Sequence, residues 1–135
     1  NEGSIRWINI LKKDRSQHSP PRWWVVLGIP DDSPVSTRQE VKIKTVRKKS
    51  FPLFGKIVDV TWKGYDGGTG LVDTLSKDIP TKTLAKRIGN LEVKSQANGF
   101  QGWTLTVDRR FSPTSQDWET VEKIAGYILS APRSL

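Results

Sequence analysis

Residues 91–108 read LEVKSQANGFQGWTLTVD, and this stretch decides the fold. Apolar and polar side chains alternate strictly over Leu91–Ser95 and again over Trp103–Asp108, which is typical of half-buried strands. Asn98-Gly99 and Gly102 lie between them and favour a tight connection. We therefore expect an antiparallel hairpin whose buried face carries Leu91, Val93, Trp103, Leu105 and Val107.

Residues 115–130 read SQDWETVEKIAGYILS and predict an amphipathic helix. Thr114 or Ser115 can cap its first turn, which contains Asp117 and Glu119, and Pro132 follows its end. Apolar residues recur every three or four positions, so one stripe of the helix needs a sheet face to cover. That stripe consists of Trp118, Val121, Ile124, Ala125, Ile128 and Leu129.

Earlier segments supply further strands with clear breaks between them. Strand composition or alternation is present over Ile5–Leu11, Arg22–Leu27, Val41–Lys48 and Ile57–Trp62. The run from Gly28 to Pro34 should end the second strand, because proline cannot donate to a ladder. In the third, Lys42, Lys44, Val46 and Lys48 point away from Val41, Ile43, Thr45 and Arg47, which makes one face basic.

The middle of the chain predicts a loop followed by helical segments. Four glycines in the eight positions from Lys63 to Gly70 indicate a loop. Leu71–Leu75 fits either a helical turn or a short strand, and we favour the turn. Asp78 or Thr81 can then cap a short helix with Leu84, Ala85 and Ile88 on one side, Pro80 near its start and Gly89-Asn90 at its end.

These elements predict an α+β fold: a mostly antiparallel sheet of about five or six strands, with the C-terminal helix and the shorter middle helix packed on one face. At 135 residues, with no repeat and only short breaks, we expect residues 1–135 to form one domain. Cysteine is absent, so packing alone must hold the fold and the compartment is left open.

The net charge of +8 is unevenly distributed. Residues 1–50 carry eleven basic and five acidic side chains, whereas residues 100–135 carry four of each. A basic half favours polyanionic partners over small acidic molecules. The longest apolar run, Trp23–Leu27, is far below the ~18 residues that indicate a membrane span. The chain starts at Asn1 without an initiator methionine, so a removed leader or anchor stays an open expectation.

Residues that could support catalysis or metal binding do not form recognisable patterns. His18 lies in a polar loop without Cys, Asp or Glu at metal-ligand spacing, and Asp31-Asp32 lies between prolines as in a turn. The glycine-rich run lacks the Gly-Lys-Ser/Thr ending of a phosphate-binding loop. We expect no cofactor, no metal and no enzymatic activity.

The best functional candidate is the segment from Lys42 to Tyr65, in which cations alternate with aromatic rings that include Phe51 and Trp62. Single-stranded nucleic acid is held by this combination, with cations on phosphates and rings stacked on bases. We expect a non-catalytic binding domain for an extended polyanion, such as single-stranded nucleic acid. Its ligand-binding residues would be Lys42, Lys44, Arg47, Lys48, Lys49, Phe54, Lys56, Lys63 and Tyr65.

Two alternatives remain open. The same lysines could protect an edge strand from aggregation while the rings pack in the core. The chain could also be a protein-interaction or structural domain, part of a larger or membrane-attached assembly, that binds a partner or itself through Trp23, Trp24, Phe51 and Phe54.

Overall fold

The computed structural model describes residue 5 and residues 7–13, 22–31, 40–49, 57–95, 102–108 and 114–131. These contain strands and helices in the order β1 (Trp7–Lys13), β2 (Arg22–Pro30), β3 (Lys42–Lys49), β4 (Ile57–Tyr65), α1 (Leu71–Lys77), α2 (Ile79–Ile88), β5 (Leu91–Ser95), β6 (Gly102–Val107) and α3 (Ser115–Ser130). The predicted α+β class is confirmed.

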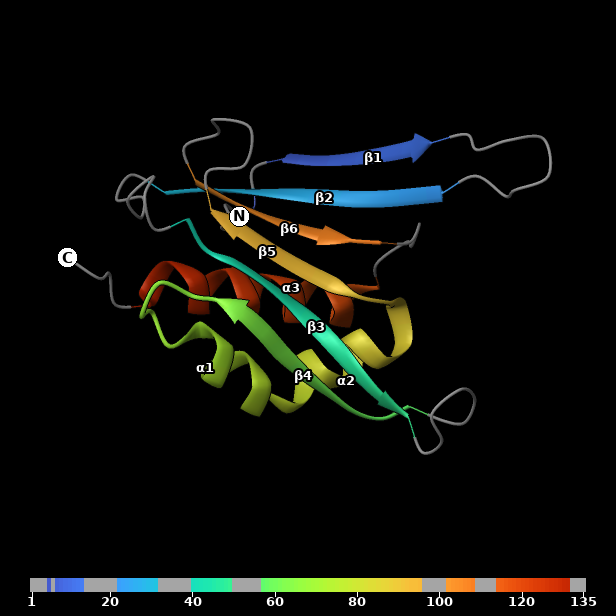
Figure 1. The fold of residues 1–135 in the computed structure, drawn as a ribbon. Coiled ribbons are helices and arrows are strands. Elements are labelled where there is room, and N and C mark those ends of the chain that lie inside the picture. The colour runs from blue at the N-terminus through green and yellow to red at the C-terminus, as the bar shows by residue number, and fades with distance from the viewer. Residues whose placement is uncertain are drawn as a thin grey trace.

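The strands form one antiparallel sheet in the order β1-β2-β6-β5-β3-β4 (Figure 1). Sequence neighbours pair in β1–β2, β3–β4 and the predicted β5–β6 hairpin. The two remaining pairings join distant segments: β2 lies beside β6, and β3 lies beside β5. These long-range pairings make a single sheet from three hairpins.

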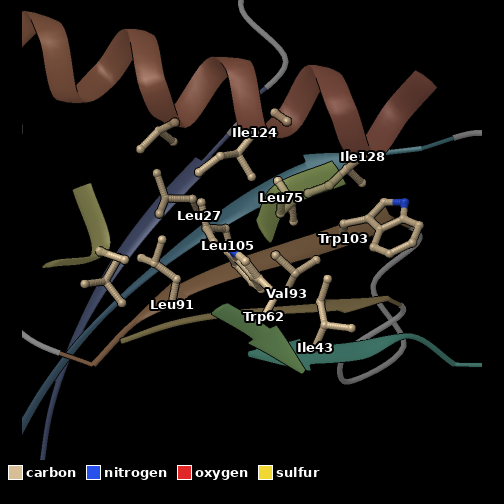
Figure 2. Close-up of a cluster of buried hydrophobic side chains, with 14 of the residues drawn as sticks. Leu27, Ile43, Trp62, Leu75, Leu91, Val93, Trp103, Leu105, Ile124 and Ile128 are labelled. Atoms are coloured by element: carbon tan, nitrogen blue, oxygen red, sulfur yellow. The ribbon is translucent and has the colours of Figure 1, made fainter. Parts of the chain in front are cut away.

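The helices lie together on one side of the sheet and bury one set of alternating side chains (Figures 1 and 2). The hairpin contributes its five predicted residues to this core, all of them buried. Residues from α1, α2 and α3 close the core from the other side, among them Leu75, Leu84 and Ile124. Complete burial of such side chains contributes roughly 1.5–3 kcal/mol each. We call this covered side the helix face and the opposite side the outer face.

Both predicted helix starts are confirmed, with one cap now assigned for each. The Asp78 carboxylate accepts a hydrogen bond from the Thr81 backbone N–H at 3.1 Å and begins α2. Thr114 and Asp117 form a reciprocal capping box at the start of α3. These side chains satisfy amides that the first helical turn leaves without partners.

Two buried tryptophans support the sheet differently. The Trp103 indole N–H donates to a carboxylate oxygen of Asp31 at 2.8 Å, so Asp31 anchors the core in addition to ending β2. Trp62, which the sequence also offered as a stacking ring, is only 2% exposed and packs in the core (Figure 2). Its indole N–H has no hydrogen-bond partner among the residues that the structure describes.

Four local predictions need correction. β2 continues to Pro30, because a proline at the last strand position leaves the rest of the ladder intact. β4 continues through Lys63 to Tyr65, because Gly64 adopts a φ of 129° beside β3. The alternation of the hairpin also predicts that Thr104, between the buried Trp103 and Leu105, faces water, but Thr104 is buried between its neighbours on the central strands. Leu129 is 37% exposed and lies outside the buried stripe of α3.

None of the helices in the described ranges has the length and hydropathy needed to span a membrane.

Candidate functional site

The outer face of β3 carries three exposed lysines in alternation with buried residues. Lys42, Lys44 and Lys48 are exposed, while Val41 and Ile43 are fully buried on the helix face. This confirms the predicted alternation of the strand. Because side chains alternate along a strand, the three ammonium groups lie on the same side of the sheet.

β4 extends this basic surface and adds an aromatic ring. Its register places Lys63 opposite Lys44, and Tyr65 opposite Lys42. The Tyr65 side chain is 53% exposed, which is unusual for a large aromatic residue on a sheet. The ring is therefore available for stacking, and two of its nearest cross-strand neighbours are cations.

A sixth residue comes from β5, on the other side of β3. Lys94 lies opposite Lys42, and its ammonium group is 3.2 Å from a carboxylate oxygen of Glu92. We call Lys42, Lys44, Lys48, Lys63, Tyr65 and Lys94 the lysine face. Alternation in residues 91–95 predicts that Lys94 points away from the core, but the β3–β5 register joins segments about fifty residues apart and could not be inferred from local patterns.

The lysine face contains like charges in direct opposition. Lys44 faces Lys63 across β3 and β4, and Lys42 faces Lys94 across β3 and β5. Like charges at directly opposed positions are destabilising by roughly 0.2–1 kcal/mol. Within the described segments, no carboxylate forms an ion pair with Lys42, Lys44, Lys48 or Lys63. Two carboxylates also lie opposite these lysines, Glu92 opposite Lys44 and Asp59 opposite Lys48, but Glu92 pairs with Lys94 and Asp59 pairs with Lys82. The lysine face therefore keeps an excess of positive charge, which a bound anion would offset.

Arg47, one of the expected ligand-binding residues, lies on the helix face. Its guanidinium donates a hydrogen bond to the Ala85 carbonyl of α2 at 2.9 Å and is partly buried. The alternation of β3 sets this direction, so Arg47 does not join the lysines of its strand. The Lys49 side chain, Phe54 and Lys56 lie outside what the structure describes, as do Phe51, His18 and the side chains of Trp23 and Trp24.

A cleft of about 450 Å³ opens beside the lysine face. β3 pairs with β5 only through Lys42, Ile43 and Lys44. β5 starts at Leu91, so beyond this point β3 continues beside β4 alone (Figure 1). The Thr45 hydroxyl bridges the start of this gap by accepting a hydrogen bond from the Leu91 N–H at 2.9 Å. The cleft is lined by Lys44, Thr45, Val46, Arg47, Asn90, Leu91, Glu92, Thr106 and Asp108.

In the glycine-rich loop, the carboxylate of Asp66 accepts hydrogen bonds from backbone amides. One carboxylate oxygen of Asp66 accepts from the Gly68 N–H at 3.1 Å, and the other accepts from the Val72 N–H at 3.2 Å in the first turn of α1. Because a carboxylate of the chain already occupies these amides, the loop has the architecture of a structural turn.

Among the described residues on the helix side of the sheet, the Asp78 carboxylate contacts Thr81, Tyr127 and Lys123. Besides capping α2, it accepts a hydrogen bond from the Tyr127 hydroxyl at 2.9 Å and lies 3.0 Å from the Lys123 ammonium group. Burial alone would raise the pKa of Asp78, but the hydrogen bonds from Thr81, Lys123 and Tyr127 outweigh it and lower the pKa to about 2. This cluster joins α2 to α3 and keeps Asp78 ionised.

Asp59 reaches the helices from the edge strand β4. Its carboxylate accepts from Lys82 of α2 at 3.1 Å and from the Val60 N–H at 2.8 Å. The hydrogen bond from Lys82 and that from Val60 lower the pKa of Asp59. The Ser76 hydroxyl accepts from the next edge amide, that of Trp62, at 3.0 Å. Side chains thus occupy two edge amides of β4 that could otherwise pair with another strand.

The described residues form an α+β fold in which helices cover one face of the sheet and the lysine face lies on the other, over β3, β4 and β5. No His, Cys, Asp and Glu cluster able to hold a metal ion is present in the described part of the chain. Comparisons with protein-family models, curated proteins and solved structures found no match to this chain.

Proposed function

We propose that this chain is a non-catalytic binding domain that holds single-stranded nucleic acid on its lysine face. The observation that supports this proposal is that the exposed Tyr65 ring lies beside cations of the neighbouring strands, namely Lys42, Lys44 and Lys63. Cations that track phosphates and a ring that stacks on bases are the two components of sequence-tolerant single-strand binding.

The shape of the surface favours a single strand over a compact anion. Its cations come from three adjacent strands, β4, β3 and β5, and therefore spread across the sheet in place of converging on one point. Successive exposed residues of one strand are about 7 Å apart, from a rise of 3.3–3.4 Å per residue. An extended polymer with repeated negative charges can contact all of these positions at once.

Self-association receives less support. At the β4 edge, Asp59 and Ser76 engage two backbone amides that an added strand would need. The rings on which a protein interface was expected have side chains outside the described residues: Trp23, Trp24, Phe51 and Phe54. The exposed ring of Tyr65 belongs to the lysine face.

The proposal is tested by fluorescence anisotropy with a labelled twelve-nucleotide oligo(dT) at about 50 mM salt. The double variant Lys44→Glu with Lys63→Glu should weaken binding by about tenfold or more, because both phosphate contacts become repulsive. The matched control is Lys77→Glu with Lys86→Glu, which changes the net charge equally but places the new carboxylates on α1 and α2.

The control should bind nearly as well as the wild-type protein, and thermal melts should confirm that both variants fold. Equal weakening by the two double variants would show that only net charge matters, and absence of binding by the wild-type protein would overturn the proposal.

A further inference from the structure

The cleft beside the lysine face differs from it in charge. Glu92 and Asp108 line one wall, opposite Lys44 and Arg47. The Arg47 guanidinium is engaged by the Ala85 carbonyl, whereas Lys44 lies at the boundary and belongs to both the cleft and the lysine face. The cleft is therefore close to neutral, while the adjoining surface is strongly positive.

Besides the donors of Lys44, Arg47 and Asn90, the cleft contains two carboxylates, those of Glu92 and Asp108, and the Glu92 carboxylate is paired with Lys94. One carboxylate oxygen of Asp108 accepts from the Asn90 N–H at 3.0 Å, and this bond leaves its second oxygen for another donor. The Thr45 hydroxyl is engaged with Leu91. Carboxylates repel phosphates but accept hydrogen bonds from exocyclic amino groups, as Asp and Glu do from cytosine N4.

A volume of about 450 Å³ falls in the range of pockets that take small organic groups. Val46, Leu91 and the Thr106 methyl group add apolar surface for the face of a ring. The cleft thus offers space, apolar contact and carboxylate acceptors next to cations suited to phosphates.

We propose that this cleft receives one base of the bound strand and selects bases that carry an exocyclic amino group, cytosine above thymine or uracil. The inference rests on the proposed function and adds a specificity to it. Lys44 holds the phosphate at the rim of the cleft, and Asp108 accepts a hydrogen bond from the amino group inside.

The experiment compares twelve-nucleotide oligo(dC) and oligo(dT) in the anisotropy assay at pH 7.5. Cytosine and thymine differ at position 4 of the ring, where cytosine carries an amino donor and thymine carries a carbonyl acceptor. The wild-type protein should bind oligo(dC) about five- to tenfold more tightly. Asp108→Asn keeps an acceptor for Asn90 but replaces the second oxygen with a donor, and it should bring the affinity ratio close to one.

Asp73→Asn, on the exposed surface of α1, removes the same charge away from the cleft and should leave the ratio unchanged. If the wild-type protein binds both oligomers equally, or if Asp108→Asn preserves the ratio, the cleft does not select bases although the lysine face still binds. If neither oligomer binds, the proposed function fails and the cleft proposal fails with it.

Discussion

The two faces of the sheet differ in whether their charged side chains are paired. On the helix face, charged groups have partners: Asp78 contacts Lys123 and Tyr127, Arg87 pairs with Asp117, and Arg47 donates to Ala85. On the outer face, Lys44 and Lys63 oppose each other and form no ion pair among the described residues, because Glu92, which lies opposite Lys44 on β5, pairs with Lys94. Paired charged side chains favour the folded state, whereas unpaired lysines can bind a ligand that carries negative charge.

Adjacent residues of β3 give the largest contrast. Ile43 is fully buried on the helix face, and Lys44 is exposed on the outer face. Ile43→Ala should lower the free energy of unfolding by about 2–5 kcal/mol, since it leaves a cavity in the core. Lys44→Ala should change it by less than about 0.5 kcal/mol. Urea denaturation measures both changes. A large loss of unfolding free energy for Lys44→Ala would contradict the proposed difference between the two faces.

Asp78 provides a pH test of charge pairing on the helix face. Its side chain is 8% exposed and its folded pKa is about 2, against an ordinary value of 3.8. A carboxylate with a lowered folded pKa stabilises the protein above its unfolded pKa, and this stabilisation disappears as the pH falls through the folded value. Its contribution at neutral pH is about 2 kcal/mol.

Asp78→Asn keeps a side-chain cap for α2 but removes the charge, so it should cost about 2 kcal/mol at pH 7. The difference from the wild-type protein should shrink as the pH falls from about 4 to 2. Asp73→Asn, in an exposed pair with Lys77, should cost less than about 0.5 kcal/mol at any pH. Denaturation series at several pH values measure these differences. A cost for Asp78→Asn that does not change with pH would assign Asp78 a role independent of its charge.

A smaller effect of opposite sign is expected on the outer face. Lys63→Glu replaces a like-charge pair with an opposite-charge pair across β3 and β4, and Lys63 is the better position because Lys44 also lies opposite Glu92 of β5. It should stabilise the free domain by about 0.2–1 kcal/mol while weakening oligonucleotide binding. Thermal melts and anisotropy on the same preparation measure both quantities. If Lys63→Glu instead destabilises the domain, Lys44 and Lys63 do not repel each other in the free protein.

Local patterns allowed much of this arrangement to be predicted. Alternation located the hairpin and the basic side of β3, and three- to four-residue spacing located α3, because both periodicities follow from backbone geometry. The pairing of β3 with β5 was not predictable, so the contribution of Lys94 and the cleft were missed. Such pairing depends on how distant segments pack together.

Gly64 shows why the end of β4 was missed. Glycine-rich composition indicates a loop, yet Gly64 lies in the strand with a φ of 129°, and a side chain there would clash with the Lys42 carbonyl. Only glycine permits this approach of β4 to β3, which brings Tyr65 opposite Lys42. One glycine that resembles a loop signal therefore completes the aromatic part of the site.

The salt dependence of oligo(dT) binding tests the central claim most directly. For single strands, log K should fall with log salt by about 0.7 for each phosphate neutralised. Lys44→Ala with Lys63→Ala should therefore reduce the magnitude of that slope by about 1.4, while Lys77→Ala with Lys86→Ala leaves it unchanged. A slope unaltered by the first pair, or reduced equally by both pairs, would contradict the assignment of binding to the lysine face.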